Sequence, residues 1–253
     1  VVYLKFLPGF YTSLSKFGLT ATAGTLESRI ADRIEGIFKR WPVDVRLDPP
    51  DDFTKNGYAT IEVGGPDPNG VGLFGYDNSP GKDVGNLRLF DAIGGANAET
   101  QADGYPGFGG VFVESLFLFS SHPESSGSVM AGPSPDPLFD EIFDPVRAVP
   151  ATLSEVQGQG DATRVTQVER ALSALASIVG ETAAHELGHS LGLAAPNGSP
   201  NQFHNAKDEP GCLMDSGGDR PLGERAEQPG FSTTRLCADA PDYLDRVFAT
   251  PGP

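Results

Sequence analysis

The sequence predicts an α+β fold, in which a twisted mixed β-sheet packs against a backing helix and a long second helix. Two helical patterns, at residues 20–41 and 161–193, enclose several strand-like segments. Helices and strands are therefore segregated along the chain instead of alternating, which is typical of α+β proteins. From residue 194 to 236 the sequence is mostly irregular, so we expect a loop-rich part after the second helix.

The first elements are a strand and a helix. Residues 1–7, VVYLKFL, read as a short apolar strand. A helix is expected over residues 20–41, because apolar residues recur there at three- and four-residue steps. Thr25 is the expected N-cap of this helix, and Pro42 stops it. The apolar residues of the pattern are Leu26, Ile30, Ile34, Ile37 and Trp41.

Four segments in the middle of the chain have the composition of β-strands. Residues 43–48 and 58–65 alternate between apolar and polar side chains. Residues 86–95 and 110–122 are two further expected strands, and the second is rich in Phe and Val. Residues 64–86 contain many turn residues and show no period, so a loop is expected there.

The second half of the chain begins with a Pro-, Ser- and Gly-rich stretch at residues 123–160, which predicts a long connection. The helical pattern at 161–193 fits one long helix or two helices joined near Gly180. Residues 241–250 predict a short closing helix, with Pro241 in its first turn.

The length of 253 residues allows one large domain or two small ones. We expect a single domain over 1–253, with an upper subdomain at 1–192 and a lower subdomain at 193–253. The formal net charge of −16 argues against a nucleic-acid partner, because phosphate binding needs a basic face. The same charge disfavours docking on an anionic membrane.

No run of about 20 apolar residues occurs, so no membrane span is expected. No signal peptide is visible in the sequence. The chain starts at Val1 instead of Met, which leaves open a signal or pro-segment removed upstream.

The two cysteines, Cys212 and Cys237, fit a single disulfide in a secreted or periplasmic protein. Closing a loop of this size stabilises a fold by roughly 3 kcal/mol in the chain-entropy model. The alternative is a pair of buried free thiols in a cytosolic protein.

The segment from His185 to Gly192 contains two overlapping motifs. Residues 188–192 spell G-x-S-x-G, the nucleophile elbow of serine hydrolases. That motif needs a buried strand before its first Gly, whereas the residues before Gly188 are Ala-rich and helical in pattern. Of the histidines, only His204 follows Ser190, so the remaining groups of such a hydrolase have little room. Substitution of Ser190 would expose this chemistry if it operated.

The second motif is H-E-x-x-H, at residues 185–189. On a helix, His185 and His189 project from one face about one turn apart, so both imidazoles can bind one Zn²⁺. Glu186 lies next to the first His and can reach a zinc-bound water as the general base. Two histidines alone rarely hold a catalytic zinc ion, so a third ligand is expected.

The string H-E-x-x-H-x-x-G, which ends at Gly192, resembles the metzincin clan of zinc peptidases. Met214, in the segment GCLMDSG at 211–217, resembles the Met-turn that forms a floor under the zinc in that clan. The resemblance covers residues 185–217. It implies a zinc metalloendopeptidase that hydrolyses peptide bonds through a zinc-bound water, with Glu186 as base. Its protein or peptide substrate would lie extended along a sheet edge, supplied by residues 86–95 or 110–119.

The sequence departs from the metzincin pattern at Ala195, where the clan has its third His. The leishmanolysins, one metzincin family, carry an insertion before this His, and a shorter insertion at 193–203 would deliver His204 to the same place. Asp208 and Glu209 are competing ligands, as in thermolysin-like enzymes, although Pro210 prevents the helix on which such a ligand lies. Ser216 occupies the place where metzincins often have a Tyr.

A catalytically weak or inactive metzincin-like binding protein is the alternative function, and Glu186 argues against it, since binding needs no general base.

His122 follows a strand-like segment with no motif around it, and we expect a structural role. A structural Ca²⁺ site or a solvated acidic loop is expected among oxygen-bearing residues of the 64–91 stretch. These residues are Asp67, Asn69, Asp77, Asn78, Asp83, Asn86 and Asp91.

Overall fold

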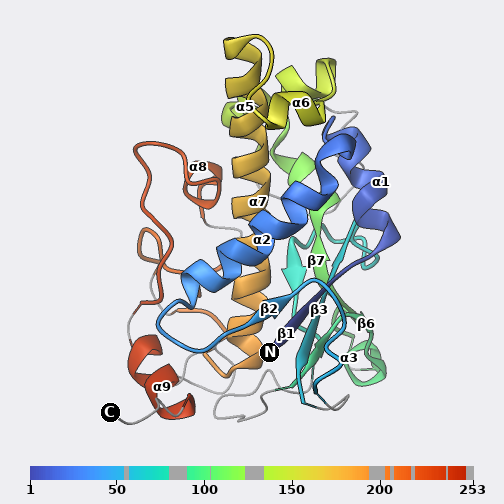
Figure 1. Ribbon diagram of the computed structural model, residues 1–253. Coiled ribbons are helices and arrows are strands. Elements are labelled where there is room, and N and C mark those ends of the chain that lie inside the picture. The colour runs from blue at the N-terminus through green and yellow to red at the C-terminus, as the bar shows by residue number, and fades with distance from the viewer. Residues whose placement is uncertain are drawn as a thin grey trace.

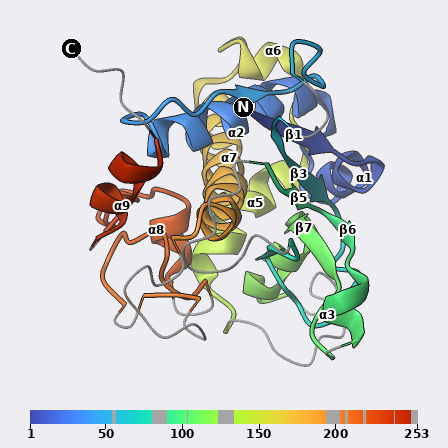
Figure 2. The same ribbon diagram turned by 90° about the horizontal axis from the view of Figure 1, so that it is seen from below.

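The computed structural model of the protein describes residues 1–53, 57–79, 90–102, 104–122, 134–193, 203–205, 208–217, 220–237 and 239–248. A long helix, α7 (Ala162–Ser190), runs through the molecule. The sheet lies on one side of α7, and the C-terminal segments with the short helices α8 (Leu222–Arg225) and α9 (Ala240–Val247) lie on the other (Figure 2). Helix α7 therefore separates two halves of the molecule and contacts both.

Seven short strands form the mixed sheet within the described residues. Its order is β2-β1-β3-β7-β4, where β5 also pairs with β3 and β6 with β7. Strands β1, β2, β3, β5 and β7 run parallel in their pairings, whereas β4 and β6 pair antiparallel with β7. The bounds are β1 Val2–Phe6, β2 Val45–Arg46, β3 Ala59–Gly64, β4 Gly75–Tyr76, β5 Ala92–Ile93, β6 Gly95–Ala96 and β7 Phe108–Phe112.

The predicted sheet packed against helices is confirmed. Helix α2 (Ala23–Ile37) crosses α7 diagonally and covers it from the front in Figure 1. The crossing is close at Gly180, where an added Cβ would lie 3.0 Å from the carbonyl oxygen of Ile30. Gly180 therefore serves helix packing and does not divide the helical pattern, so α7 is one helix and not two.

The predicted start of α2 is wrong. The helix begins at Ala23 with Thr22 as N-cap, so Thr25 lies inside the first turn. Leu26, Ile30 and Ile34 are buried as expected from their spacing. The helix ends at Ile37, before Pro42 is reached.

The expected strand at 110–122 is correct only in its first part. Strand β7 ends at Phe112, and a 3₁₀ segment, η2 (Val113–Phe119), follows. The chain leaves the sheet at Glu114, whose carboxylate accepts hydrogen bonds from Ser13 Oγ at 2.8 Å and Lys16 Nζ at 2.7 Å. Ser13 and Lys16 belong to helix α1 (Pro8–Lys16), which sequence periodicity did not predict.

The connection predicted at 123–160 contains two helices in its described part, α5 (Pro137–Ala148) and α6 (Leu153–Val156). Helix α5 packs aromatic side chains into the core: Phe139 and Phe143 lie within 6.3 Å of Phe17, measured between ring centroids. Phe17 in turn stacks on Phe117 of η2 at 4.4 Å.

The remaining described helices are η1 (Thr20–Thr22) and α3 (Ala98–Ala102). Helix α9 confirms a closing helix with Pro241 in its first turn, although it ends at Val247, and residues 249 and 250 lie outside the described residues.

Candidate metal centre

Helix α7 delivers two imidazoles to one point near its C-terminal end. His185 and His189 are one turn apart, and their Nε2 atoms are 3.1 Å apart. Two nitrogens bound to one tetrahedral zinc ion at 2.0–2.1 Å would be separated by about 3.3 Å. The spacing of these two atoms therefore fits shared coordination of a small cation.

His204 joins this pair from a separate segment. Its ring centroid lies 5.3 Å from that of His185 and 5.3 Å from that of His189. The three side chains offer ligand nitrogens that all lie within 4.8 Å of one another. The structure thus brings together the three residues that the sequence singled out, and their role as metal ligands stays a prediction.

The position of His204 is fixed through its neighbour Asn205. The Asn205 backbone N–H donates to the Met214 carbonyl at 2.9 Å, and its side-chain amide donates to Asp215 Oδ1 at 2.6 Å. Asp215 is buried and also accepts the backbone N–H of Glu209 at 2.7 Å. These contacts dock His204 on the segment that contains Met214.

The His185 ring is oriented by a backbone carbonyl. Its Nδ1 lies 2.6 Å from the carbonyl oxygen of Leu213, which can only accept a hydrogen bond. The proton of the neutral ring therefore belongs on Nδ1, and the lone pair on Nε2 points to the other histidines. Such a carbonyl partner is the usual support of a metal-binding histidine.

The turn after α7 is fixed by Gly192. Its φ of 79° lies in the left-handed region, where a side chain is unfavourable. Two hydrogen bonds close the turn, from Gly192 N to the His189 carbonyl and from Leu193 N to the Gly188 carbonyl, both at 2.9 Å. This is the Schellman arrangement that ends a helix and redirects the chain.

Met214 packs against α7 at Gly188, one residue before His189. It is buried, and its Sδ would be 2.5 Å from a Cβ added at Gly188. A side chain at position 188 would therefore require Met214 to shift. The role of Met214 as a Met-turn stays a prediction.

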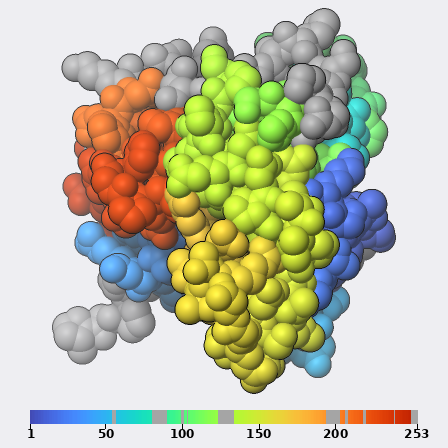
Figure 3. All heavy atoms as spheres, turned by 90° about the horizontal axis from the view of Figure 1, so that it is seen from above, coloured from blue at the N-terminus to red at the C-terminus, as the bar shows by residue number. Residues whose placement is uncertain are grey.

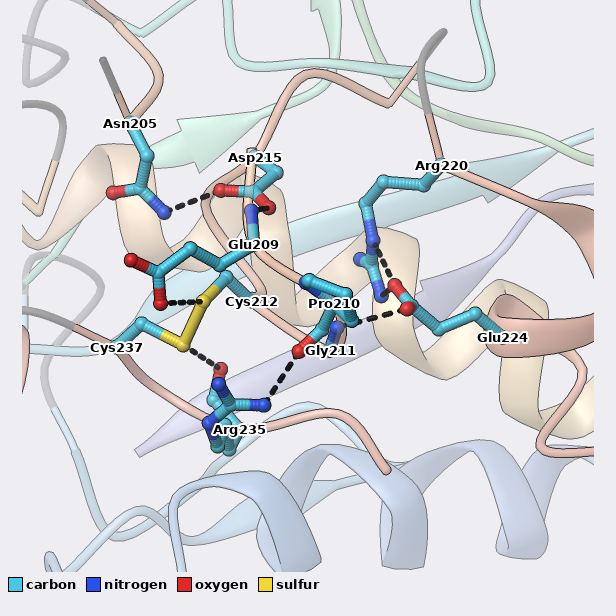
Figure 4. The surroundings of a disulfide bond; sticks show 10 residues. All are labelled: Asn205, Glu209, Pro210, Gly211, Cys212, Asp215, Arg220, Glu224, Arg235 and Cys237. Carbon is cyan, nitrogen blue, oxygen red and sulfur yellow. Dashed lines mark hydrogen bonds and ion pairs between the residues drawn. A yellow bond between two sulfur atoms is a disulfide. The ribbon is translucent and has the colours of Figure 1, made fainter. Parts of the chain in front are cut away.

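The Cys212–Cys237 disulfide holds the Met214 segment in place, and its prediction is confirmed. Next to it, Leu213 N donates to the Arg235 carbonyl at 2.9 Å, and Arg235 N donates to the Gly211 carbonyl at 2.8 Å. Figure 4 shows the disulfide together with Arg235, whose Nη1 donates to the Pro210 carbonyl at 2.6 Å. These contacts position Leu213, the residue whose carbonyl orients His185.

Glu186 is buried on the side of α7 that faces strand β4. An added Cβ at Gly75 would lie 2.5 Å from Glu186 Oε1 and 2.7 Å from Thr182 Cγ2. The backbone of β4 therefore approaches the carboxylate directly because Gly75 has no side chain. Desolvation raises the pKa of the neighbouring Tyr76, and the charges of Asp77 and Glu186 add to the effect.

The buried guanidinium of Arg225 contacts three segments near Glu186. Arg225 Nη2 donates to Thr182 Oγ1 at 2.9 Å, and its Nη1 donates to the Gly217 carbonyl at 3.2 Å. Its guanidinium carbon lies 4.7 Å from the centre of the Phe74 ring. Burial, with the adjacent Arg220, lowers the pKa of Arg225 to about 9, so the side chain stays cationic at neutral pH. Arg225 thus links α7, the segment after Met214 and the residue before β4.

Next to Arg225, the buried side chain of Arg220 pairs with two buried carboxylates. Arg220 forms ion pairs with Glu181 of α7 and with Glu224 of α8, the second at 2.9 Å. The other oxygen of Glu224 accepts the backbone N–H of Gly211 at 2.8 Å (Figure 4). Sequence reasoning missed Arg220 and Arg225, because charged residues in an irregular stretch give no sign of burial.

The competing ligands do not join the histidines. Glu209 is exposed, and its carboxylate lies at the disulfide, 4.0 Å from Cys212 Sγ. Asp208 is exposed as well. In the part of the chain that the structure describes, the candidate metal group around α7 contains His204 and neither acidic residue.

The serine-nucleophile interpretation is wrong. Gly188 and Ser190 lie within the continuous helix α7, so the strand and sharp turn of a nucleophile elbow are absent at this described segment. Ser190 is 1% exposed, and its hydroxyl donates to Asp91 Oδ2 at 2.9 Å. Its role is to tie the end of α7 to the chain before β5.

The structure describes some of the expected calcium ligands and not others. Asp83 and Asn86 lie outside the described residues. Asp67 Oδ2 accepts the backbone N–H groups of Val71, Gly72 and Leu73 at 3.0–3.2 Å, and so stabilises its own turn. Asn78 Nδ2 donates to the carbonyls of residues 94, 95 and 107. Calcium binding stays a prediction.

Comparison of the chain with protein-family models, with curated proteins and with solved structures finds no match. Among the described residues, no helix has both the length and the apolar composition that crossing a membrane requires.

Proposed function

We propose that the protein is a zinc-dependent endopeptidase of metzincin type. The proposal rests on the convergence of His185, His189 and His204, and on Glu186, which follows His185 in α7. Three protein nitrogens with an open fourth position are the ligand set of catalytic zinc sites. Structural zinc sites instead use four protein ligands, usually including Cys, and both cysteines here are in the disulfide.

The orientation of the donors supports zinc as the ion. His185 presents the Nε2 lone pair, because its Nδ1 faces the Leu213 carbonyl. Imidazole is a ligand suited to zinc, whereas calcium and magnesium prefer oxygen. A bound zinc ion would supply Lewis-acid polarisation of the scissile carbonyl and a water of lowered pKa.

Glu186 acts as the general base of the proposed reaction. It takes a proton from the attacking water and delivers it to the amine that leaves when the peptide bond breaks. Its burial beside the β4 backbone excludes bulk water from one side of the carboxylate. Arg225 provides a cation in the same buried region, where its charge interacts with that of Glu186.

The substrate is a protein or peptide segment in extended form, bound along β4. Strand β4 is the terminal strand of the order β2-β1-β3-β7-β4, and it contacts α7. The described parts of the two expected segments do not form this edge: β7, which overlaps 110–119 only at residues 110–112, is an interior strand, and β5, in the described part of 86–95, pairs with β3. A chain added beyond β4 would pass Glu186 at Gly75.

We also propose that the protein works outside the cytoplasm. The Cys212–Cys237 disulfide supports this, because disulfides persist in secreted and periplasmic proteins and are rare in reducing compartments.

Two substitutions test the proposed function. Glu186→Gln should keep one zinc ion at the histidines and lose cleavage of an unfolded protein substrate, because the base is gone while the ligands stay. His189→Ala should lose both zinc and cleavage. If the wild-type protein binds zinc but cleaves no substrate, and Glu186→Gln behaves identically, the inactive binding protein replaces the peptidase.

A further inference from the structure

His122, Asp140 and Asp144 form a second cluster of metal-ligating side chains, remote in sequence from the His185 site. His122 Nε2 lies 3.0 Å from Asp144 Oδ2 and 3.8 Å from Asp140 Oδ1. All three ligand atoms lie within 4.8 Å of one another. Asp140 and Asp144 are one turn apart on α5, so both carboxylates face His122 from the same side of the helix.

Each carboxylate of the cluster is held by a separate partner. Ser120 Oγ donates to Asp140 Oδ1 at 2.6 Å, and Ser121 N donates to Asp140 Oδ2 at 2.9 Å. These two hydrogen bonds fix the orientation of the Asp140 carboxylate. Arg147 Nη1 donates to Asp144 Oδ1 at 3.1 Å, which leaves Oδ2 facing the imidazole.

The cluster is open to solvent. The side chains of His122 and Asp144 are each 44% exposed, whereas Asp140 is 12% exposed and forms the base of the cluster. Helix α5 forms much of the outer face of the molecule in the view from above (Figure 3). An ion can therefore reach the three ligand atoms without unfolding of the surrounding elements, and water can fill its remaining coordination positions.

We propose that His122, Asp140 and Asp144 bind a divalent transition-metal ion such as Zn²⁺. One imidazole and two carboxylates are ligands that zinc and its neighbours in the first transition row accept. His122 Nε2 lies 3.0 Å from the Asp144 oxygen and 3.8 Å from the Asp140 oxygen. These two distances lie on either side of the ligand–ligand distance of about 3.3 Å in tetrahedral coordination. His122, which the sequence suggested as merely structural, is the residue that selects such an ion over calcium or magnesium.

The bound ion would join two elements. His122 follows η2, whereas Asp140 and Asp144 belong to α5. Because the ligands converge only in the folded chain, binding stabilises the fold by mass action.

The zinc ions bound per chain, counted by equilibrium dialysis with Zn²⁺ alone, test the proposal. Asp144→Asn and His122→Gln should each bind one zinc ion fewer than the wild-type protein. The matched control is Glu141→Gln on the same helix, because Glu141 is 64% exposed and pairs with Arg170 away from the cluster. This variant should bind the wild-type number of ions.

Unchanged zinc counts in Asp144→Asn and His122→Gln would overturn the proposal. Circular dichroism of each variant shows whether its fold is intact. Because His122 lies outside α5, a local folding defect in α5 caused by Asp144→Asn would not affect the result for His122→Gln. The His185 site is tested separately, because His189→Ala should lose one ion whether or not this cluster binds zinc.

Discussion

The sulfur of Met214 lies directly against Gly188 of the helix that carries the histidines, and a Cβ at Gly188 would be 2.5 Å from it. Gly188 lies one residue before His189, and Met214 lies one residue after Leu213, whose carbonyl orients His185. This single contact therefore couples both helical histidines to the segment on which His204 is docked.

We predict that Gly188→Ala lowers both stability and zinc affinity. The added methyl group forces Met214 away from α7, and overpacking of this kind costs about 1–3 kcal/mol. Thermal unfolding and zinc titration measure the two effects. Gly24→Ala in α2 is the matched control, because its Cβ would meet nothing within 4 Å. Equal zinc affinity in the two variants would contradict the coupling.

Gly75→Ala should reduce cleavage while zinc stays bound. The new Cβ would lie 2.5 Å from Glu186 Oε1, so either the carboxylate or strand β4 must shift. Displacement of a catalytic group by about 1 Å can cost on the order of 100-fold in rate. The kcat/KM for an unfolded protein substrate and the zinc content of the same sample provide the measurement. Wild-type kcat/KM would show that the approach of β4 to Glu186 has no functional role.

Arg220→Met should be strongly destabilising. It leaves the buried carboxylates of Glu181 and Glu224 without their shared cation, and breaking a buried pair costs about 3–5 kcal/mol. Arg29→Met is the control, since the Arg29–Glu169 pair is largely exposed and such pairs contribute about 0–1 kcal/mol. Urea unfolding of both variants compares the two losses. A similar midpoint for the two would mean that the Arg220 pairs contribute little.

Reduction of the Cys212–Cys237 disulfide should destabilise the protein by roughly 3 kcal/mol in the chain-entropy model. We also expect weaker zinc binding, because the bond holds the segment that contains Leu213 and Met214. A Cys212→Ser/Cys237→Ser variant, titrated with zinc beside the wild-type protein, separates the two effects. Loss of stability with unchanged zinc affinity would limit the disulfide to a stabilising role.

The parts of the fold that the sequence predicted well are those with a clear period. Leu26, Ile30 and Ile34 mark the buried face of α2, and the pattern from 161 to 193 corresponds to α7. His185, Glu186 and His189 could be proposed as site residues because the H-E-x-x-H spacing on a helix places both histidines on one face. His204 had no such spacing, and the resemblance to a family with an insertion suggested it.

Helix α5 was missed because Pro and Ser residues before it, and Pro145 within it, resemble a connection. A signal was nevertheless present: Asp136 is an N-cap before Pro137, and apolar residues recur at helical spacing. These residues are Phe139, Ile142, Phe143 and Val146, and all are buried.

Strand β4 could not be predicted, since Gly75 and Tyr76 form a two-residue strand in a Gly-rich stretch. Its existence depends on pairing with β7, which only the folded chain provides. The burial of Arg220 and Arg225 likewise depends on α8 packing against α7, and no local pattern records it.

An X-ray anomalous difference map at the zinc absorption edge, from protein never exposed to a chelator, is the most direct test of zinc binding by the three histidines. We expect a peak within bonding distance of His185, His189 and His204. A peak with a different third protein ligand would contradict the role of His204. No peak at these histidines, with the rings of His185 and His189 turned apart, would contradict the zinc peptidase itself.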